Sequence, residues 1–258
     1  MAAFELEVVD GHIAVMHLNR PEAMNAINRE MREGMDAAFA RLNSDRELRV
    51  AILIGEGGRA FSAGADLKEM AEGGDRGTPW TPRAQSLMGT LEVWKPLIAA
   101  IDGFCLGGGL EMSLACDIRV ATAASQFGLP EVSRGIIPGA GGTQRITRAI
   151  PFGIALELLM TGKRIGADEA ARWGIVNHVV ASRDELLPKC MEIAGQIGQN
   201  GPLAVQAVKE AAYRGRYTTL AEGLRIEQFE SALLGNTEDA KEGPRAFAEK
   251  RPANFQGR

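Results

Sequence analysis

The sequence lacks the features that mark secreted, membrane-spanning and nucleic-acid-binding proteins. Its 258 residues include only three cysteines, Cys105, Cys116 and Cys190, which form no CxxC pair and are too few for a disulfide framework, so a reducing cytoplasm is expected. The longest apolar stretches, such as residues 96–101, are far too short to cross a bilayer, and the N-terminus lacks the basic and apolar regions of a secretory signal. The net charge of -4 argues against a nucleic-acid-binding protein, which usually carries a basic stripe.

The motifs of several common chemistries are also missing. The chain contains no GxGxxG, GxxxxGK(S/T), HExxH or GxSxG sequence, the signatures of dinucleotide binding, P-loops, zinc proteases and many hydrolases. The three histidines, His12, His17 and His178, fall in expected strands, where a solvent-facing or hydrogen-bonded imidazole is the ordinary interpretation. No metal site is therefore predicted.

The chain does contain alternating strand-like and helical segments, with 45% hydrophobic residues to build a core. Residues 4–9 and 12–18 flank an Asp-Gly pair and predict a β-hairpin. Residues 28–42 carry apolar side chains at helical spacing, and residues 49–55 predict a strand buried on both faces. This alternation predicts an α/β fold.

The pattern becomes purely helical toward the C-terminus. A Gly-Pro pair at residues 201–202 is a plausible helix break. We therefore divide the chain into a core, residues 1–200, and a C-terminal helical region, residues 201–258.

Two glycine-containing segments have the composition of ligand-binding loops. Residues 60–67, AFSAGADL, leave backbone N–H groups accessible after a strand; the alternative is a tight turn before a helix capped by Asp66. Residues 107–111, GGGLE, open a helix with unpaired N–H groups, which is one way to stabilise an oxyanion; the alternative is close packing of the helix start. Glu111 is then either a helix cap or a buried reagent.

A third segment supplies a second carboxyl group. Residues 127–131, FGLPE, precede the glycine-rich residues 135–142. Glu131 follows Glu111 by 20 positions, and the intervening strands could bring the two side chains together. Paired carboxyl groups with different pKa values can divide acid and base work between them. Taken alone, Glu131 could be an ordinary surface glutamate after a proline.

At this point the sequence resembles the enoyl-CoA hydratase (crotonase) family, and the true 2-enoyl-CoA hydratases closely. The resemblance covers nearly the whole chain in the right order. The segments that carry it are NRPEAMNAI, AFSAGADL, IAAIDGFCLGGGLEMSLACDI, FGLPE, PGAGGTQRITR, TGKRIGADEA, WGIVNHVV and EGPRAFAEKRPANF.

The resemblance implies a crotonase-type spiral of repeated ββα units with a C-terminal α-helical trimerisation region. It implies a homotrimer, or a homohexamer built as a dimer of trimers. The substrate would be an acyl-CoA thioester of fatty acid and lipid metabolism in the cytoplasm. No cofactor is expected, because CoA is part of the substrate.

The resemblance also assigns site residues. The catalytic acids would be Glu111 and Glu131, and the backbone N–H groups of Ser62 and Gly108 would form the oxyanion hole. Lys250 matches a family lysine that can reach the CoA of a neighbouring subunit. The full set of expected substrate-binding residues is Ala60, Ser62, Ala63, Gly64, Ala65, Asp66, Leu67, Gly108 and Lys250.

The predicted function is therefore a lyase reaction, the reversible addition of water across the 2,3 double bond of 2-enoyl-CoA. The alternative is another crotonase-type lyase or isomerase that shifts a double bond, or dehydrates a carnitinyl-CoA-type substrate. Isomerases of the family often keep one of the two acids, so the pair favours hydration. A non-catalytic binding protein would be expected to lack the acids or glycines, and a peptidase would need a serine–histidine arrangement that is not apparent.

Two departures from the family pattern bear on the acyl group. Arg134 stands where the family often has an apolar residue, and it could alter acyl preference or pair with a carboxylate. Residues 72–83 lie where the family varies the wall of the acyl tunnel, and Trp80 either shapes that wall or packs within its own loop. The acyl chain, the pathway and the stereochemistry are left open by the sequence.

Overall fold

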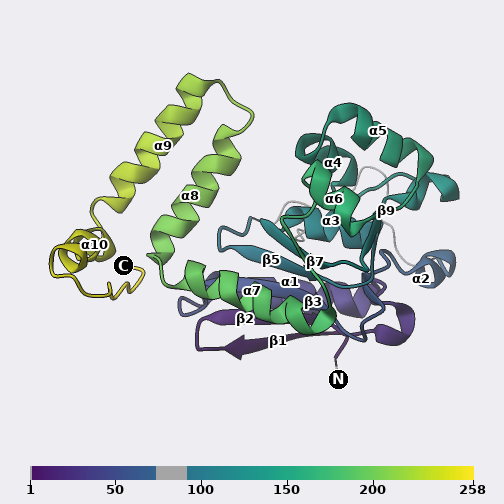
Figure 1. The fold of residues 1–258 in the computed structure, drawn as a ribbon, viewed down its shortest axis with the longest axis horizontal. Coiled ribbons are helices and arrows are strands. Elements are labelled where there is room, and N and C mark those ends of the chain that lie inside the picture. Colours follow the sequence, from purple (N-terminus) through teal and green to yellow (C-terminus); the bar gives the residue numbers. More distant parts are fainter. Residues whose placement is uncertain (1, 74–91) are drawn as a thin grey trace.

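The strands of the chain form two sheets of different size. The computed structural model describes residues 2–73 and 92–258, and Figure 1 shows its fold. Within these residues the larger sheet has six strands in the order β1-β2-β3-β5-β7-β10, parallel except for the β1-β2 pair. Its strands are β1 (Phe4–Val9), β2 (Ile13–Leu18), β3 (Val50–Gly55), β5 (Leu97–Ile101), β7 (Ile118–Thr122) and β10 (His178–Val180).

The predicted hairpin is confirmed. Asp10 and Gly11 are the two central residues of a tight turn closed by the hydrogen bond from His12 N to Val9 O, and both have the positive φ that such a turn requires. The second strand begins at Ile13, so His12 lies in the turn rather than in the expected strand. Its Nδ1 lies 2.7 Å from the carbonyl oxygen of Asp10, because the turn brings the two residues together.

The strands of the smaller sheet alternate along the chain with strands of the larger sheet. Its strands are β4 (Ala60–Ser62), β6 (Phe104–Leu106), β8 (Gln126–Gly128) and β9 (Ile165–Gly166). Three successive units place one strand in the larger sheet (β3, β5, β7) and the next in the smaller sheet (β4, β6, β8) before a helix follows. The helices that follow are α2 (Leu67–Ala71), α3 (Gly108–Ala115), and the 3-10 helix η2 (Pro130–Arg134) with α4 (Gly142–Ala149). This confirms the predicted α/β fold of repeated ββα units.

Helices cover both faces of the larger sheet. Helix α1 (Arg29–Ser44) begins after Asn28, whose side chain accepts a hydrogen bond from the N–H of Met31, and its apolar face is buried as expected. Helix α7 (Arg183–Gly198) packs on the opposite face, in front of the sheet in Figure 1. Strand β3 is therefore buried on both sides, which explains its continuous apolar sequence.

The remaining short helices gather above the sheets, around the ends of the ββα units (Figure 1). The short 3-10 helix η1 (Pro21–Ala23) follows β2 and buries none of its residues, and the helices above the sheets are α5 (Phe152–Thr161) and α6 (Ala167–Trp173). Together with α3 and α4 they enclose the larger of two apolar cores, whereas α7 closes the smaller one.

The C-terminal helices form an arm that projects from this body. Helices α8 (Pro202–Gly215) and α9 (Leu220–Leu234) form a hairpin, and α10 (Glu238–Ala248) lies at the end of the hairpin where α8 begins, opposite the α8–α9 connection (Figure 1). Helix α9, described over its whole length, buries none of its residues. The chain passes from α7 to α8 between Gly198 and Pro202, at the place where the sequence suggested a break.

Two expected absences concern membranes and metals. Among residues 2–73 and 92–258, no helix combines the length and hydrophobicity needed to cross a membrane. The same residues include no cluster of three or more His, Cys, Asp and Glu side chains suited to a metal ion. Residues 74–83, including Trp80, lie outside the described residues, so the expected tunnel wall stays a prediction.

The three cysteines are free and buried. Burial raises the pKa of each thiol to about 12, which leaves these side chains protonated at neutral pH.

Candidate active site

Two glycine-containing loops meet backbone to backbone at the start of α3. Gly64 has a φ of +93°, and a β-carbon there would lie 2.9 Å from the nitrogen of Gly108. A β-carbon on Gly108 would in turn lie 3.6 Å from the nitrogen of Ala65. Residues 60–67 and 107–111, which the sequence singled out separately, therefore form one surface.

Two N–H groups on this surface have no backbone acceptor among the described residues. Gly108 is the first residue of α3, so its N–H has no partner within the helix. Ala65 forms an isolated parallel bridge with Ile27, in which Ile27 N donates to Gly64 O (2.8 Å) and Asp66 N donates to Ile27 O (3.1 Å). Because alternate peptide groups of an extended chain point to opposite sides, the N–H of Ala65 points away from Ile27. The amides of Ala65 and Gly108 are thus available to one ligand atom.

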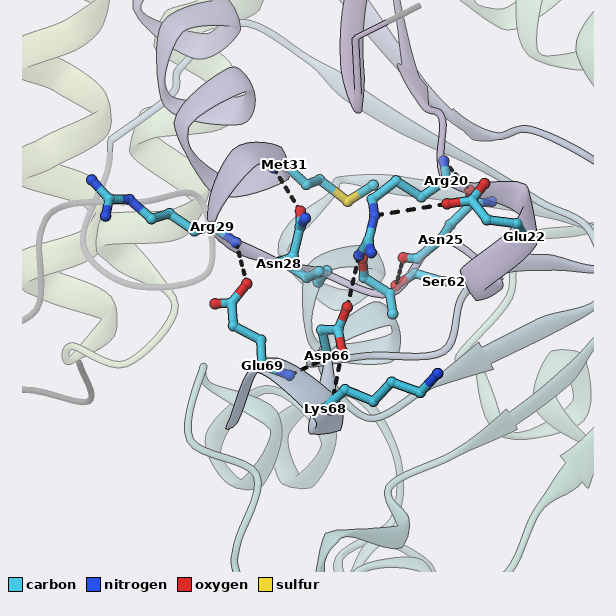
Figure 2. Close-up of polar contacts among 12 residues, drawn as sticks. Arg20, Glu22, Asn25, Asn28, Arg29, Met31, Ser62, Asp66, Lys68 and Glu69 are labelled. Atoms are coloured by element: carbon cyan, nitrogen blue, oxygen red, sulfur yellow. Dashed lines mark hydrogen bonds and ion pairs between the residues drawn. The ribbon is translucent and has the colours of Figure 1, made fainter. Parts of the chain in front are cut away.

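Ser62, the expected donor, occupies a different place. It is the last residue of β4 and is fully buried, and its β-carbon lies 2.8 Å from where a β-carbon on Gly109 would be. Its Oγ donates to the carbonyl of Asn25 (2.8 Å) and accepts from the N–H of Gly64 (3.2 Å), as Figure 2 shows for Asn25. Ser62 as an oxyanion donor therefore stays a prediction, and the N–H of this segment that lies beside Gly108 is that of Ala65, because the strand continues through Ser62 and the chain turns toward Gly108 only afterwards.

A buried network of hydrogen bonds, which the sequence did not reveal, fixes the loop that follows β4. Asn25 is fully buried with a φ of 53°, and its Nδ2 donates to the carbonyls of Glu56 (2.9 Å) and Ala60 (2.8 Å). Its Oδ1 accepts from the N–H of Arg20 (2.9 Å). The only sequence signal was that NRPEAMNAI matched the family, because the contacts themselves join segments about 30 residues apart.

Asp66 connects this network to α2. Its Oδ2 accepts from Arg20 Nη1 at 2.9 Å, and its Oδ1 accepts from the N–H groups of Lys68 and Glu69, so it caps α2 as the plain alternative predicted (Figure 2). Burial opposes ionisation of Asp66, but the hydrogen bonds from Arg20 and the two amides outweigh it and lower the pKa of the carboxyl group. Residues 60–66 are thereby fixed as a rigid edge of the site.

Glu111 lies in the first turn of α3 with only 3% of its surface exposed. Its Oε1 accepts two hydrogen bonds of 2.7 Å, from the N–H groups of Ala140 and Gly142. A β-carbon on Gly142 would lie 2.9 Å from the same oxygen, so only glycine permits this approach. Glu111 is therefore a buried side chain held by another loop, and not a cap of its own helix.

Glu131 lies in η2, across the glycine loop from the Ala65 side. Its Oε1 would be 3.1 Å from a β-carbon on Gly107, and its Oε2 is buried without a hydrogen-bond partner among the described residues. Burial raises the pKa of Glu131, and the nearby charge of Glu111 acts in the same direction, against its own amide and Arg134. The fold thus brings together the two glutamates that the sequence paired.

The other expected binding residues have mixed positions. Ala60 and Ala63 make structural backbone contacts, since Ala60 O accepts from Asn25 and Ala63 N donates to Met24 O (3.0 Å). Leu67 is exposed at the start of α2. Lys250 follows α10, at the opposite end of the molecule from α2 and α3 in Figure 1, so it does not reach the site of its own subunit.

Arg134 forms its hydrogen bonds within its own turn. Its Nη1 donates to the carbonyl of Pro130 and to Ser133 Oγ, both at 3.2 Å. In the part of the chain that the structure describes, it forms no salt bridge with a carboxylate. The expected pairing with a protein carboxylate is therefore not found there, and the effect on acyl preference stays a prediction.

This arrangement defines a class of site. Two main-chain N–H donors can hold one carbonyl oxygen as negative charge develops on it, while two carboxyl groups beside them can move protons at the neighbouring carbons. A family model described as Enoyl-CoA hydratase/isomerase matches residues 9–258, and the chain belongs to this family.

Individual relatives agree with this membership. The crotonyl-CoA hydratase of Syntrophomonas wolfei subsp. wolfei is 42% identical over 94% of this chain and 94% of its own. The carnitinyl-CoA dehydratase of Salmonella agona is 41% identical over 96% of this chain and 97% of its own. The crystal structure of an enoyl-CoA hydratase from Mycobacterium tuberculosis H37Rv superposes with a TM-score of 0.92, 37% identity and complete coverage of both chains. The crotonase fold is thus common to this chain and to solved structures.

Proposed function

We propose that this chain is a 2-enoyl-CoA hydratase that adds water reversibly across the 2,3 double bond of an acyl-CoA thioester. One observation carries the proposal: Glu111 and Glu131 flank the same glycine loop from which the Gly108 amide points out. The amide donors alone do not specify hydration, because such donors serve many thioester reactions, so the proposal depends on the pair of glutamates beside them. The similarity to a crotonyl-CoA hydratase supports the same reaction.

The amides of Ala65 and Gly108 would bind the thioester oxygen. As water adds to C3, electron density moves onto this oxygen, and donors that are already in place stabilise it without reorganisation. Removing one such donor typically costs about 3 kcal/mol of transition-state stabilisation. The Arg20–Asp66 and Asn25 contacts support this role by fixing the loop that carries Ala65.

The two glutamates would divide the proton transfers. Glu111, with Oε1 occupied by two amides, presents its other oxygen to water and takes the proton that water loses as its oxygen bonds to C3. Glu131 would give a proton to C2, and burial favours this role by raising the pKa of its carboxyl group. One proton is taken and one is given, so the product is the neutral 3-hydroxyacyl thioester. Each transfer is worth roughly 10²–10⁴-fold in rate.

The proposal needs no cofactor beyond the CoA that the substrate brings. Cytoplasmic location is likewise proposed, because three free buried thiols suit a reducing compartment.

The C-terminal arm supports a homotrimer, or a homohexamer made from two trimers. Its helices expose large apolar side chains that a lone subunit leaves in water, a pattern typical of an interaction surface. These side chains are Leu220, Leu224, Phe229, Leu233 and Phe247. In such an assembly Lys250 could contact the CoA of a neighbouring subunit. Light scattering combined with size-exclusion chromatography gives the subunit number directly.

The function is tested by following the ultraviolet absorbance of the conjugated thioester. Crotonyl-CoA and longer 2-enoyl-CoA esters should lose this absorbance when enzyme is added, and mass spectrometry should find the product heavier by one water. Absence of any change across the chain-length series would exclude ordinary hydration.

The alternative, dehydration of a substrate resembling carnitinyl-CoA, is supported by the similar relative of that name. It would instead appear as gain of absorbance from carnitinyl-CoA with no reaction of crotonyl-CoA.

A further inference from the structure

We propose that Arg145 is a positioning residue for Glu111, and that it acts by holding the carbonyl group of Ala140. The arginine thus acts on the carboxylate through one intervening peptide group. The inference rests on the proposed function, since it concerns how the hydratase orients its base. The family resemblance gives this arginine no role.

The first step of the argument is the shape of the loop before α4. The N–H groups of Ala140 and Gly142 both point at Glu111 Oε1, each at 2.7 Å. The carbonyl of Ala140 lies between them along the chain and accepts from Arg145 Nη1 at 2.8 Å. Successive peptide groups therefore alternate, with N–H groups toward the carboxylate and the intervening carbonyl toward the arginine. Such a concave arrangement of amides is an anion-binding geometry.

The second step is the path of the arginine side chain. Arg145 belongs to the first turn of α4, and its N–H donates to the carbonyl of Gly141 at 2.8 Å. Its guanidinium folds back over Gly141, where a β-carbon would collide with Nη1. Gly141 has a φ of +101°, which a side chain rarely adopts. The glycine thus provides both the loop conformation and the space that the guanidinium fills.

The third step is the charge around Arg145. Burial lowers the pKa of the guanidinium, while Tyr213, Glu111 and Cys116 act in the opposite direction. The cation is thus partly removed from water and lies within the electrostatic reach of the Glu111 carboxylate. A cation held in this way stabilises the orientation of the Ala140 carbonyl more strongly than a neutral donor would.

The consequence concerns the reactive oxygen. Two fixed N–H donors on Oε1 prevent the carboxylate from rotating, so the other oxygen keeps one direction toward the substrate. Without Arg145, the Ala140 carbonyl loses its charged donor and the loop can turn its amides away. A misplacement of about 1 Å in a catalytic group can cost roughly 10²-fold in rate.

The test compares Arg145→Gln with Arg148→Gln. Arg148 lies on the same helix, is exposed, and contacts Gln144 and the ring of Tyr217, so it is a matched control. For crotonyl-CoA hydration we expect Arg145→Gln to lower kcat by about 10- to 100-fold, with KM changed less than about 3-fold. Arg148→Gln should keep the parental kcat, and Arg145→Lys, which retains a charged donor, should recover part of the loss.

A double variant shows whether the arginine acts through Glu111. The Glu111→Gln/Arg145→Gln protein should turn over no more slowly than Glu111→Gln alone, because the base that Arg145 orients is already lost. Multiplication of the two defects would overturn the proposal. So would equal kcat values for Arg145→Gln and Arg148→Gln.

Amide hydrogen exchange gives a readout that does not depend on turnover. The Ala140 and Gly142 amides should exchange faster in Arg145→Gln than in the parent or in Arg148→Gln, and unchanged exchange would overturn the proposal. If the parental protein does not hydrate any enoyl thioester, the proposed function fails while this exchange result still decides whether Arg145 fixes the loop. If Arg145→Gln does not fold, Arg145→Lys is compared in the same way, with a smaller acceleration expected and parental exchange and kcat contradicting the proposal.

Discussion

The two carboxyl groups of the site have opposite surroundings. Glu111 projects from a regular helix into a loop that gives its Oε1 two amide donors, whereas Glu131 projects from a short 3-10 helix and leaves a buried Oε2 without a donor among the described residues. The carboxyl group of Glu111 is therefore held in one orientation, whereas the charged form of Glu131 is destabilised. The difference indicates that a protein can obtain two chemical roles from one residue type by distributing hydrogen-bond donors unequally.

The strongest test of this comparison is the loss of each acid in turn. Glu131→Gln should lower kcat for crotonyl-CoA by about 10³-fold, because an amide has no proton to give to C2. Glu111→Gln should lower it by about 10²-fold or more, because the amide oxygen can still accept from Ala140 and Gly142 but cannot take a proton from water. Affinity for a non-reactive acyl-CoA, measured by calorimetry, should stay near the parental value. Parental turnover in either variant would mean that the residue is structural.

A side chain placed at the amide donors should impair substrate binding, and with it the proton transfers by both glutamates. Gly108→Val should lower both acyl-CoA affinity and kcat/KM, by about 10²-fold or more, because its side chain would enter the space beside the Ala65 nitrogen. Ser62→Ala is the matched control behind α3, and it should keep kcat/KM within about 3-fold while losing the hydrogen bond to Asn25, worth about 1 kcal/mol. Parental acyl-CoA affinity and kcat/KM in Gly108→Val would contradict the assignment of the Gly108 amide as a donor.

Stability measurements should rank the two acids in the reverse order, with the larger loss of stability at Glu111. Glu111→Ala leaves the N–H groups of Ala140 and Gly142 without their acceptor and should cost about 2–4 kcal/mol in the free energy of unfolding. Glu131→Ala removes an oxygen that had no donor among the described residues, so its cost should be clearly smaller. Urea denaturation measures both values, and equal losses would remove the basis of the comparison.

The smallest expected effect is a difference in how stability depends on pH. The folded protein keeps the Glu131 proton to higher pH than the unfolded chain does, because its pKa is raised. This group therefore costs stability as pH rises from the ordinary glutamate pKa, about 4.3, through the raised value. Glu131→Gln lacks this loss, so its stability relative to the parent should increase with pH over that window and match it at lower pH. Denaturation curves that stay parallel across the window would contradict the raised pKa.

Local sequence signals predicted most of the fold because they act over a few residues. The Asp10-Gly11 turn, the buried strand β3 and the apolar face of α1 each follow from spacing or backbone preference. The histidine at position 12 shows the usual limit, since a strand boundary was displaced by one residue and left His12 in the turn.

The site was predicted less completely because its geometry depends on contacts between distant segments. The pairing of Glu111 with Glu131 followed from their spacing, and the resemblance gave the pair its catalytic role, but the sequence directed attention to the Ser62 amide, whereas the amide beside Gly108 in the structure is that of Ala65. Nothing local to residues 60–67 tells which N–H is released, because the bridge to Ile27 decides it. In the same way, the grip of Ala140 and Gly142 on Glu111 joins positions about 30 apart.

The repeated ββα path has a consequence for how the protein acquires activity. The first unit contributes residues 60–66, the second residues 107–111, and the third Glu131 and the loop before α4. No single unit contains a complete site, and joining the units requires closure of long loops, which is slow compared with local helix formation. During refolding, turnover should therefore return only when all three ββα units have packed together. This should happen later than the return of helical circular dichroism.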